Sequence, residues 1–396
     1  MYMSDLDRRA FLKGGFAALA AFLGVPLLQS CGGDGGDGGA FSGPFPSLGP
    51  MRPPDVNGVR LPAGFTSRIV ARSGVAPVIG GPAWHAAPDG GACFPTSDGG
   101  WIYVSNSEVG SGGGGVRALR FDAAANITGC EIICSGTSRN CAGGRMPWGA
   151  WLTCEENGDT GRVFECDPLG VMAAAPRPAL GSFNHEAAAW DDTEGRIYLT
   201  EDRSDGGFYR FTPAGYADLS AGTLEVAQVA GGGPERIVSW LTVPDPDGSP
   251  VATRHQVATM TPFNGGEGVV ARDGVVHFAT KGDNRIWSYD VATGQLSILY
   301  DDSTSPTPFL TGVDNLEISA DGDLFVAEDG GDMQLVAISP DGEVLQVLQL
   351  VGHPSSEITG PAFDPSGSRL YFSSQRGATG NSSDGVTYEI TGPFVV

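Results

Sequence analysis

The feature that most constrains the fold is a unit that recurs from about residue 95 onward. Each copy has a turn with glycine, a short apolar run and then an acidic or polar cluster. The copies read WIYVSNSE, AWLTCEEN, RIYLTEDR, VVHFATKGDN, LFVAEDGG and RLYFSSQRG. A period near 45 residues that holds several short strands is typical of a β-propeller blade.

The spacing of the copies sets the number of blades. Steps of 47, 46, 45 and 46 residues run from Glu108 to Glu155, Glu155 to Glu201, Asp283 to Glu328 and Glu328 to Ser374. Between Glu201 and Asp283 lie 82 residues, nearly two periods, which leaves room for either a further blade or a loop insertion. We therefore predict an all-β fold, a six-bladed β-propeller, with seven blades as the alternative.

Strands that end at equivalent places in every blade bring their last residues to one mouth of the central channel. Taken singly, each acidic residue there reads as an ordinary exposed turn carboxylate. Together they would repel one another unless cations lay between them. The predicted metal ligands are Asn106, Glu108, Cys154, Glu155, Glu186, Glu201, Glu267, Asp283, Asp314 and Glu328, and Asp202 and Asp329 belong to the same clusters.

The stretch WLTCEEN places Cys154 directly before two carboxylates. Carboxylate and amide oxygens suit Ca²⁺, whereas a thiolate beside them suits a softer or more highly charged ion. We expect Cys154 and Glu155 to hold that ion and Glu156 to serve a neighbouring cation or to hydrogen-bond nearby. Ligand types alone leave iron and zinc equally favoured, and the alternative is a strand end with an acidic turn and a free thiol.

The N-terminal segment indicates export. Residues 1–30 combine Arg8, Arg9 and Lys13 with a short apolar stretch, as twin-arginine signal peptides do. The sequence LQSC ends at Cys31 and resembles a lipidation site, so we expect a periplasmic or cell-surface protein, anchored by lipid if Cys31 is acylated. Residues 31–55 then form a flexible tether and residues 56–396 the propeller domain. Six cysteines remain after Cys31; their connectivity is open, and the cluster 130, 134 and 141 is compatible with a local bridge.

Charge narrows the class of partner. The net charge of −23 repels nucleic acids and attracts multivalent cations. Basic side chains beside the acidic clusters are therefore informative: Lys281 and Arg203 are the predicted catalytic residues that clamp a phosphate, with salt bridges to their neighbours as the equal alternative. Arg145 is a weaker third choice. No G-x-S-x-G elbow occurs, so no serine nucleophile is indicated.

Several blocks carry a family likeness. NCAGGRMPWGAWLTCEEN, FNHEAA, IYLTEDR, PFNGGEG, FATKGDNRIWSYD, GVDNLEIS, LFVAEDGG and EITGPAFDPSGSRLYFSSQ occur in this order. Together they closely resemble the PhoX-type family of secreted alkaline phosphatases, of which this would be a short member. One difference lies in the first blade, where Asn106-Ser107-Glu108 stands in place of the family's Asn-His-Glu.

The resemblance implies a six-bladed propeller that holds iron (Fe) and calcium (Ca) at the channel mouth and hydrolyses phosphate monoesters. Small phosphorylated molecules would be its substrates, and we expect a monomer with no nucleic-acid partner. A second hypothesis is a calcium-dependent lactonase-like propeller hydrolase. A third is a non-catalytic surface propeller that metals only stabilise.

Overall fold

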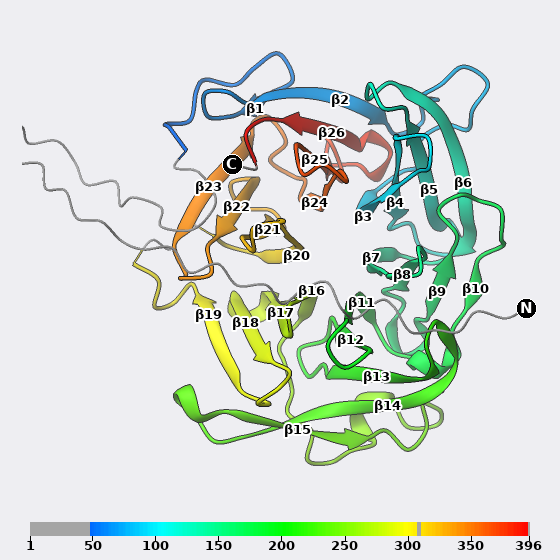
Figure 1. Cartoon of the computed structure of the whole chain (residues 1–396), viewed down its shortest axis with the longest axis vertical. Coiled ribbons are helices and arrows are strands. Elements are labelled where there is room, and N and C mark those ends of the chain that lie inside the picture. The colour runs from blue at the N-terminus through cyan, green and yellow to red at the C-terminus, as the bar shows by residue number, and fades with distance from the viewer. Residues whose placement is uncertain (1–47, 307–309, 395–396) are drawn as a thin grey trace, which may run out of the picture. The chain divides into compact units, whose positions relative to one another are not determined.

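Six antiparallel sheets surround a common centre in the computed structural model, which describes residues 48–306 and 310–394 (Figure 1). Within these residues the only helices are short 3₁₀ turns. The all-β fold and the six-bladed β-propeller are confirmed. None of the described helices is long and apolar enough to cross a membrane. The predicted signal peptide, Cys31 and the first part of the tether lie outside the described residues.

Each blade is one sheet, and the blades follow one another along the chain. Blade 1 contains β3 (Pro88–Pro95), β4 (Trp101–Ser107), β5 (Gly114–Phe121) and β6 (Ile127–Thr137). Blade 2 contains β7 (Asn140–Arg145), β8 (Trp151–Glu155), β9 (Val163–Cys166) and β10 (Ala175–Pro176). Blade 3 contains β11 (His185–Asp191), β12 (Arg196–Glu201), β13 (Phe208–Gly215), β14 (Asp218–Ala230) and β15 (Ile237–Thr242).

The second half of the ring repeats this pattern. Blade 4 contains β16 (Gly266–Arg272), β17 (Val275–Thr280), β18 (Arg285–Asp290) and β19 (Leu296–Asp301). Blade 5 contains β20 (Val313–Ile318), β21 (Leu324–Glu328), β22 (Gln334–Ile338) and β23 (Val344–Leu350), with β1 (Val59–Arg60) on its outer edge. Blade 6 contains β24 (Ile358–Phe363), β25 (Arg369–Ser374) and β26 (Val386–Thr391), with β2 (Thr66–Arg72) outside them.

Both ends of the chain build blade 6. Strand β2 precedes blade 1 in sequence, yet it pairs antiparallel with β26, the last strand. The buried Trp84 Nε1 strengthens this joint by donating a hydrogen bond of 2.9 Å to Thr387 Oγ1 on β26. Strand β26 is therefore paired on both sides, by β25 and by β2, and a segment that precedes blade 1 is tied to the last blade.

The 82-residue gap contains an insertion and no further blade. Blade 3 has a fifth strand, β15, which pairs with the long strand β14. A connection over residues 243–265 follows, and it contains the 3₁₀ turn η4 (Thr253–His255). The other 3₁₀ turns are η1 (Gly158–Thr160), η2 (Pro178–Leu180), η3 (Gly233–Glu235), η5 (Lys281–Asp283) and η6 (Ser382–Asp384).

Apolar side chains hold neighbouring blades together. Phe208 of blade 3 stacks on Phe278 of blade 4 with ring centroids 4.1 Å apart, and both side chains are buried. Burying a phenylalanine contributes about 1.5–3 kcal/mol, so such contacts repeated between blades account for much of the ring's stability. The polar ends of the inner strands are thereby fixed on a rigid frame.

The six strands nearest the centre share one irregularity (Figure 1). At its start, each of β3, β7, β11, β16, β20 and β24 has a β-bulge against the second strand of its blade. In β11, His185 pairs with Glu201 and Ala188 with Leu199, so two residues oppose one. A β-bulge changes the direction of a side chain that regular strand pairing would keep on the face of the sheet.

Candidate metal centre

The first residue of each bulge defines one set of side chains at the centre of the ring. Blades 1 to 6 place Asp89, Cys141, Glu186, Glu267, Asp314 and Gly360 at this position. Five of the six positions therefore carry a group that can bind a metal ion. The exception has a steric reason: Gly360 has φ +58°, and a Cβ on it would lie 2.5 Å from the backbone oxygen of Asp89.

A second set of side chains directly follows the second strand of each blade. The first residue after β4, β8, β12, β17, β21 and β25 is Glu108, Glu156, Asp202, Lys281, Asp329 and Gln375, respectively. Glu357, just before β24, adds a carboxylate from blade 6.

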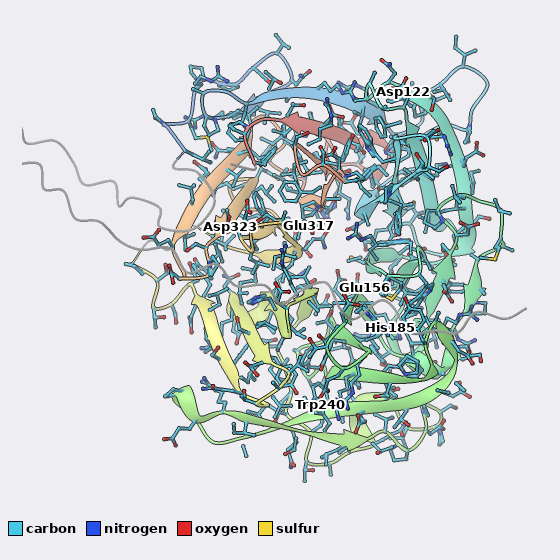
Figure 2. The ribbon with its side chains drawn as sticks, in the orientation of Figure 1. Asp122, Glu156, His185, Trp240, Glu317 and Asp323 are labelled. Atoms are coloured by element: carbon cyan, nitrogen blue, oxygen red, sulfur yellow. The ribbon has the colours of Figure 1, made fainter. Side chains whose placement is uncertain are left out.

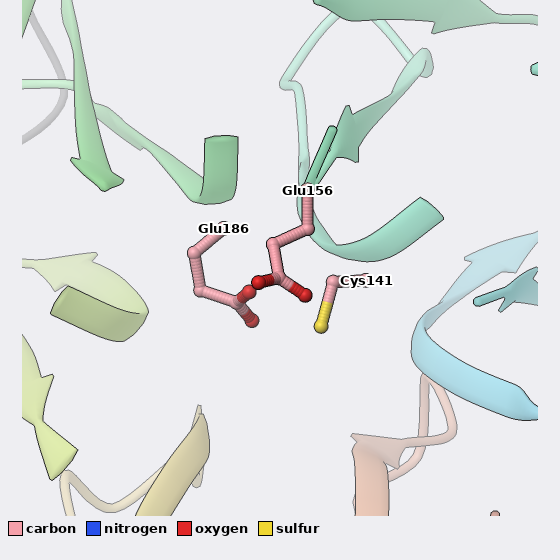
Figure 3. Close-up of side chains that lie close together, drawn as sticks. All are labelled: Cys141, Glu156 and Glu186. Carbon is pink, nitrogen blue, oxygen red and sulfur yellow. The ribbon is translucent and has the colours of Figure 1, made fainter. Parts of the chain in front are cut away.

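Nine of these side chains form groups with metal-binding geometry, and we call them the axial cluster. In each of four groups of three residues, one ligand atom per residue lies within 4.8 Å of the others. The groups are Cys141, Glu156 and Glu186; Asp89, Glu108 and Glu357; Glu186, Glu267 and Asp314; and Asp314, Asp329 and Glu357. Figure 3 shows the first group, whose thiol and two carboxylates point toward one another from three separate segments of chain. Glu186, Asp314 and Glu357 each belong to two groups, so the sites are contiguous.

Burial makes this arrangement costly unless positive charge is present. The Glu186 side chain is 1% exposed, and its Oε1 has no hydrogen-bond partner. Burial raises its pKa well above the usual value, and the charges of Glu267 and Asp314 raise it further. Burial also raises the pKa of Asp314 to about 7 and that of Glu156 to about 7. A bound cation would remove these penalties by favouring the ionised forms.

Hydrogen bonds fix part of the cluster across blades. Gln375 Nε2 donates to Asp89 Oδ2 at 2.6 Å and to Glu108 Oε2 at 2.9 Å, which joins blade 6 to blade 1. Asn184 Nδ2 donates to Glu156 Oε1 at 2.9 Å. Such donors orient carboxylates toward a metal and leave their other oxygen available to it.

Two basic side chains border the cluster. Lys281 Nζ lies 2.8 Å from Glu267 Oε1 and 3.2 Å from Asp329 Oδ2. The charges of Glu267 and Asp314 raise the pKa of Lys281 even though burial opposes this. Arg376 Nη2 donates to Glu357 Oε1 at 2.7 Å. Lys281 and Arg376 thus supply positive charge from blades 4 and 6.

The donor set fits two kinds of ion. Cys141 offers a thiol, whose pKa burial and the charge of Asp89 raise well above the usual value, so the bare site favours the protonated form. A thiolate with two carboxylates suits a transition metal ion such as iron. The groups built from carboxylates alone suit Ca²⁺, which binds several oxygens with adaptable geometry.

The structure brings four predicted ligands together: Glu108, Glu186, Glu267 and Asp314 all belong to the axial cluster. The six other predicted ligands lie elsewhere, and three of them share one cause. Glu155, Glu201 and Glu328 are the last residues of β8, β12 and β21. Because side chains alternate along a strand, each lies one residue away from the position that reaches the centre.

These three carboxylates accept hydrogen bonds within their own blades instead of facing the centre of the ring. Glu155 accepts hydrogen bonds from the N–H groups of Ser138 and Arg162, and Glu328 from those of Thr311 and Gln334. Glu201 accepts from Gly207 N and Tyr209 Oη, and Arg254 pairs with it at 3.1 Å. They hold the turns of their blades, and the neighbours Glu156, Asp202 and Asp329 occupy the central positions.

The prediction for Cys154 is wrong in its placement. Cys154 is fully buried among apolar side chains that include Leu152, Val163 and Leu180. It faces the bulge of β7, where the thiol of Cys141 is directed to the cluster. The segment WLTCEEN therefore contributes Glu156 to the axial cluster, whereas its cysteine packs in an apolar core.

Two further ligand predictions are corrected. Asn106 is buried between blades 1 and 2, where its Nδ2 donates to the carbonyl oxygens of Cys141 and Ala142 and its Oδ1 accepts from Trp151 Nε1. It therefore positions the strand that carries Cys141. Asp283 lies on η5, bonded to Thr280 Oγ1 and paired with Arg285 at 2.8 Å.

The two predicted catalytic residues differ in position. Lys281 borders the axial cluster, whereas the side chain of Arg203 is exposed. Arg145 lines a cavity of about 470 Å³ toward the other end of the inner strands, with Arg272 and Glu317. Figure 2 shows where Glu156 and Glu317 lie in the ring.

Sequence reasoning missed Asp89, Cys141 and Glu357, and it underweighted Asp329. Asp89 and Cys141 precede glycines in PDGG and NCAGG, at the same offset from their strand pair as Glu186 in NHEAA and Glu267 in GGEG. Aligning the inner strands instead of the second strands would have found them. Glu357 follows no such pattern, because blade 6 replaces the bulge carboxylate by Gly360.

Comparison with known proteins gives a match to one family model over part of the chain. The model of the family "Alkaline phosphatase PhoX" matches residues 112–285, which include Cys141, Glu156, Glu186 and Glu267. The resemblance to the PhoX family is confirmed. No curated protein matches the chain.

Solved structures reproduce the fold. Pseudomonas fluorescens PhoX, solved in complex with vanadate, described as a transition state analogue, superposes with a TM-score of 0.72 at 18% identity, covering 87% of this chain and 97% of that one. A Bacteroides thetaiotaomicron protein of unknown function gives a TM-score of 0.52 at 10% identity, covering 83% and 76%. At such identities the likeness to PhoX concerns the fold, and the residues of the site rest on the geometry above.

Proposed function

We propose that this protein is a metal-dependent phosphatase that hydrolyses phosphate monoesters at the axial cluster. The observation that carries the proposal is the convergence of eight carboxylates and one thiol from all six blades, among which the buried Glu186 Oε1 lacks a hydrogen-bond partner. The match to the family model of alkaline phosphatase PhoX supports the reaction class. The vanadate bound by Pseudomonas fluorescens PhoX mimics phosphate and supports the same class.

The proposed ions are iron and calcium. Cys141, Glu156 and Glu186 would hold iron, because only this group offers a thiolate. The carboxylate groups around Asp314 and around Asp89 would hold calcium. Such ions neutralise phosphate oxygens and lower the pKa of bound water, which supplies a nucleophile without a serine.

The chain's own residues have distinct tasks in this proposal. Lys281 and Arg376 present positive charge to the phosphate. The ammonium of Lys281 acts as a point charge, and the guanidinium of Arg376 can donate two parallel hydrogen bonds. Gln375 and Asn184 keep the carboxylates of Asp89 and Glu156 oriented. The net charge of −23 disfavours nucleic acids, so small phosphorylated molecules are the proposed substrates.

Localisation and assembly remain proposals from the sequence. The paired arginines at Arg8 and Arg9 support export to the periplasm or the cell surface, and Cys31 supports a lipid anchor there. We propose a monomer, because one chain closes the ring and supplies every group of the axial cluster.

The test compares two cysteine variants. Cys141→Ala should lose iron, measured by elemental analysis, and should lose hydrolysis of p-nitrophenyl phosphate. Cys154→Ala is the matched control, because it removes a buried thiol from the same blade without touching the cluster. Full activity in Cys141→Ala, or equal iron loss in both variants, would contradict the iron site.

The substrate class is tested on the unaltered protein. Chelation should abolish p-nitrophenyl phosphate hydrolysis, and calcium with iron should restore it. Hydrolysis of a lactone with none of p-nitrophenyl phosphate would favour the lactonase alternative. Bound metal with neither activity would favour a non-catalytic propeller.

A further inference from the structure

Two cysteines on neighbouring blades meet at the outer part of the ring. Cys134 lies on β6, the outermost strand of blade 1, and Cys166 ends β9 of blade 2 (Figure 1). Both belong to one apolar cluster, which includes Ile133 and Trp151, and their exposed fractions are 6% and 1%. Each thiol shifts the pKa of the other, lowering that of Cys134 and raising that of Cys166, as expected of two sulfur atoms close together in this cluster.

Strand register separates two other pairs of described cysteines. Cys93 and Cys130 occupy the same row of blade 1, but Tyr103 and Leu119 lie between them, so three strand spacings separate them by about 14 Å. Cys130 and Cys134 are four residues apart on one strand, about 13 Å. Disulfides require Cα atoms within about 7 Å, which excludes the pairings Cys93–Cys130 and Cys130–Cys134.

We infer that Cys134 and Cys166 form an inter-blade disulfide that ties blade 1 to blade 2 when the protein meets an oxidising compartment. Nothing about this crosslink depends on the phosphatase proposal. It does agree with export through the twin-arginine route, which carries folded proteins, because the folded chain already holds the two thiols together.

The two thiols have different roles in forming the bond. Cys134 is the more exposed of the two residues, at 6% against 1%, and its interaction with Cys166 lowers its pKa, so we assign Cys134 as the nucleophile. The Cys134 thiolate attacks one sulfur of a disulfide oxidant and displaces the first oxidant thiol. Cys166 then loses its proton, attacks Cys134 Sγ and displaces the second. The protein loses two thiols, and the oxidant disulfide is reduced to two thiols.

The proposed crosslink is connected to the strand that carries Cys141 through Trp151 and Asn106. Cys166 pairs with Trp151 on β8, and Trp151 Nε1 donates to Asn106 Oδ1 at 2.9 Å. Asn106 in turn binds the carbonyl oxygens of Cys141 at 3.0 Å and of Ala142 at 2.7 Å. A covalent tie between the two blades would therefore stabilise the interface that positions the thiol of the axial cluster.

Peptide mapping of the full chain tests the inference directly. The protein is treated with oxidised glutathione, remaining thiols are blocked with N-ethylmaleimide, and peptides are compared with and without reduction. We expect one linked peptide that joins residues 134 and 166. The link should persist in Cys130→Ala, the matched control on the same strand. Both thiols carrying the blocking group, or a link to a different cysteine, would overturn the inference.

A second measurement checks the nucleophile and the stability. In Cys166→Ser, oxidised glutathione should modify Cys134 to a greater extent than any other cysteine. Greater modification of another cysteine would contradict the assignment of Cys134 as the nucleophile. A crosslink that closes about 30 residues should raise Tm by about 5 °C for a domain of this size. Reductant should therefore lower Tm in the oxidised unaltered protein and leave the double variant Cys134→Ser, Cys166→Ser unchanged; a Tm that does not respond to reductant would count against the bond.

Discussion

The metal-free protein should lose stability toward unfolding as pH rises. The pKa of Glu156 gives the size of this loss. Burial raises the pKa of Glu156 from 4.5 to about 7, and the charges of Asp202 and Glu108 add to the shift. The folded state therefore holds this proton more tightly than the unfolded chain. Its contribution to the free energy of unfolding is fully present below about pH 4.5 and is lost progressively as pH rises to about 7.

A rise in the pKa of Glu156 from 4.5 to about 7 corresponds to about 3 kcal/mol of unfolding free energy, which is an upper value because Glu156 is partly accessible to solvent. Glu156→Gln has no proton to lose. After metal removal it should be more stable than the unaltered protein by up to about 3 kcal/mol at pH 8 and should show no such gain at pH 4.5.

Thermal or urea unfolding of chelated protein at several pH values measures this difference. The control is Glu235→Gln, which removes the same charge from an exposed 3₁₀ turn and should not reproduce the gain. Adding calcium and iron should reverse the order, because the unaltered protein regains a ligand that the variant lacks. The reasoning fails if the two proteins have equal stability at pH 8 without metal, or if the gain is as large at pH 4.5.

Three further predictions use individual side chains. Gly360→Ala should destabilise the protein by more than about 1 kcal/mol in urea unfolding, because its Cβ would meet a backbone oxygen 2.5 Å away at φ +58°; unchanged stability would refute the close approach. Asp329→Asn should reduce bound calcium, whereas Glu328→Gln should lower Tm and keep the metal content, and the reverse result would refute the one-residue assignment. Lys281→Met should raise KM for p-nitrophenyl phosphate by at least about tenfold, while Arg203→Ala, at an exposed position, should stay within about twofold.

The fold followed from the sequence because its signal repeats. Each blade repeats an apolar strand and a polar end, and a period near 45 residues leaves few architectures. The period could not show whether the 82-residue gap holds a further blade. The reason is that β15 and the connection after it are about as long as a blade but do not form one. Only the observed pairing of β15 with β14 distinguishes an added strand from an added sheet.

The sequence indicated which strand ends carry acidic residues, and the structure decides which residue of each adjacent pair lies at the centre of the ring. Sequence clusters such as TEDR and AEDG contain two adjacent acids, and composition cannot tell which of the two points inward. A single residue decides this, because neighbouring side chains of a strand lie on opposite sides. For the cysteines the difficulty was greater: Cys141 reaches the centre only because a bulge turns the start of β7, and a bulge between glycines and alanines has no marker in one sequence.

The joint between the first and last blades has a bearing on when the metals can bind. The group formed by Asp89, Glu108 and Glu357 spans that joint, and Gln375 donates to Asp89 from 286 positions further along the chain. A ribosome-bound chain that has not yet made blade 6 therefore lacks part of this site, however well its earlier blades have folded. An ion at this group would bind only after blade 6 has been made, and it would hold blade 1 to blade 6 through Asp89, Glu108 and Glu357, a contact that a chelator would release.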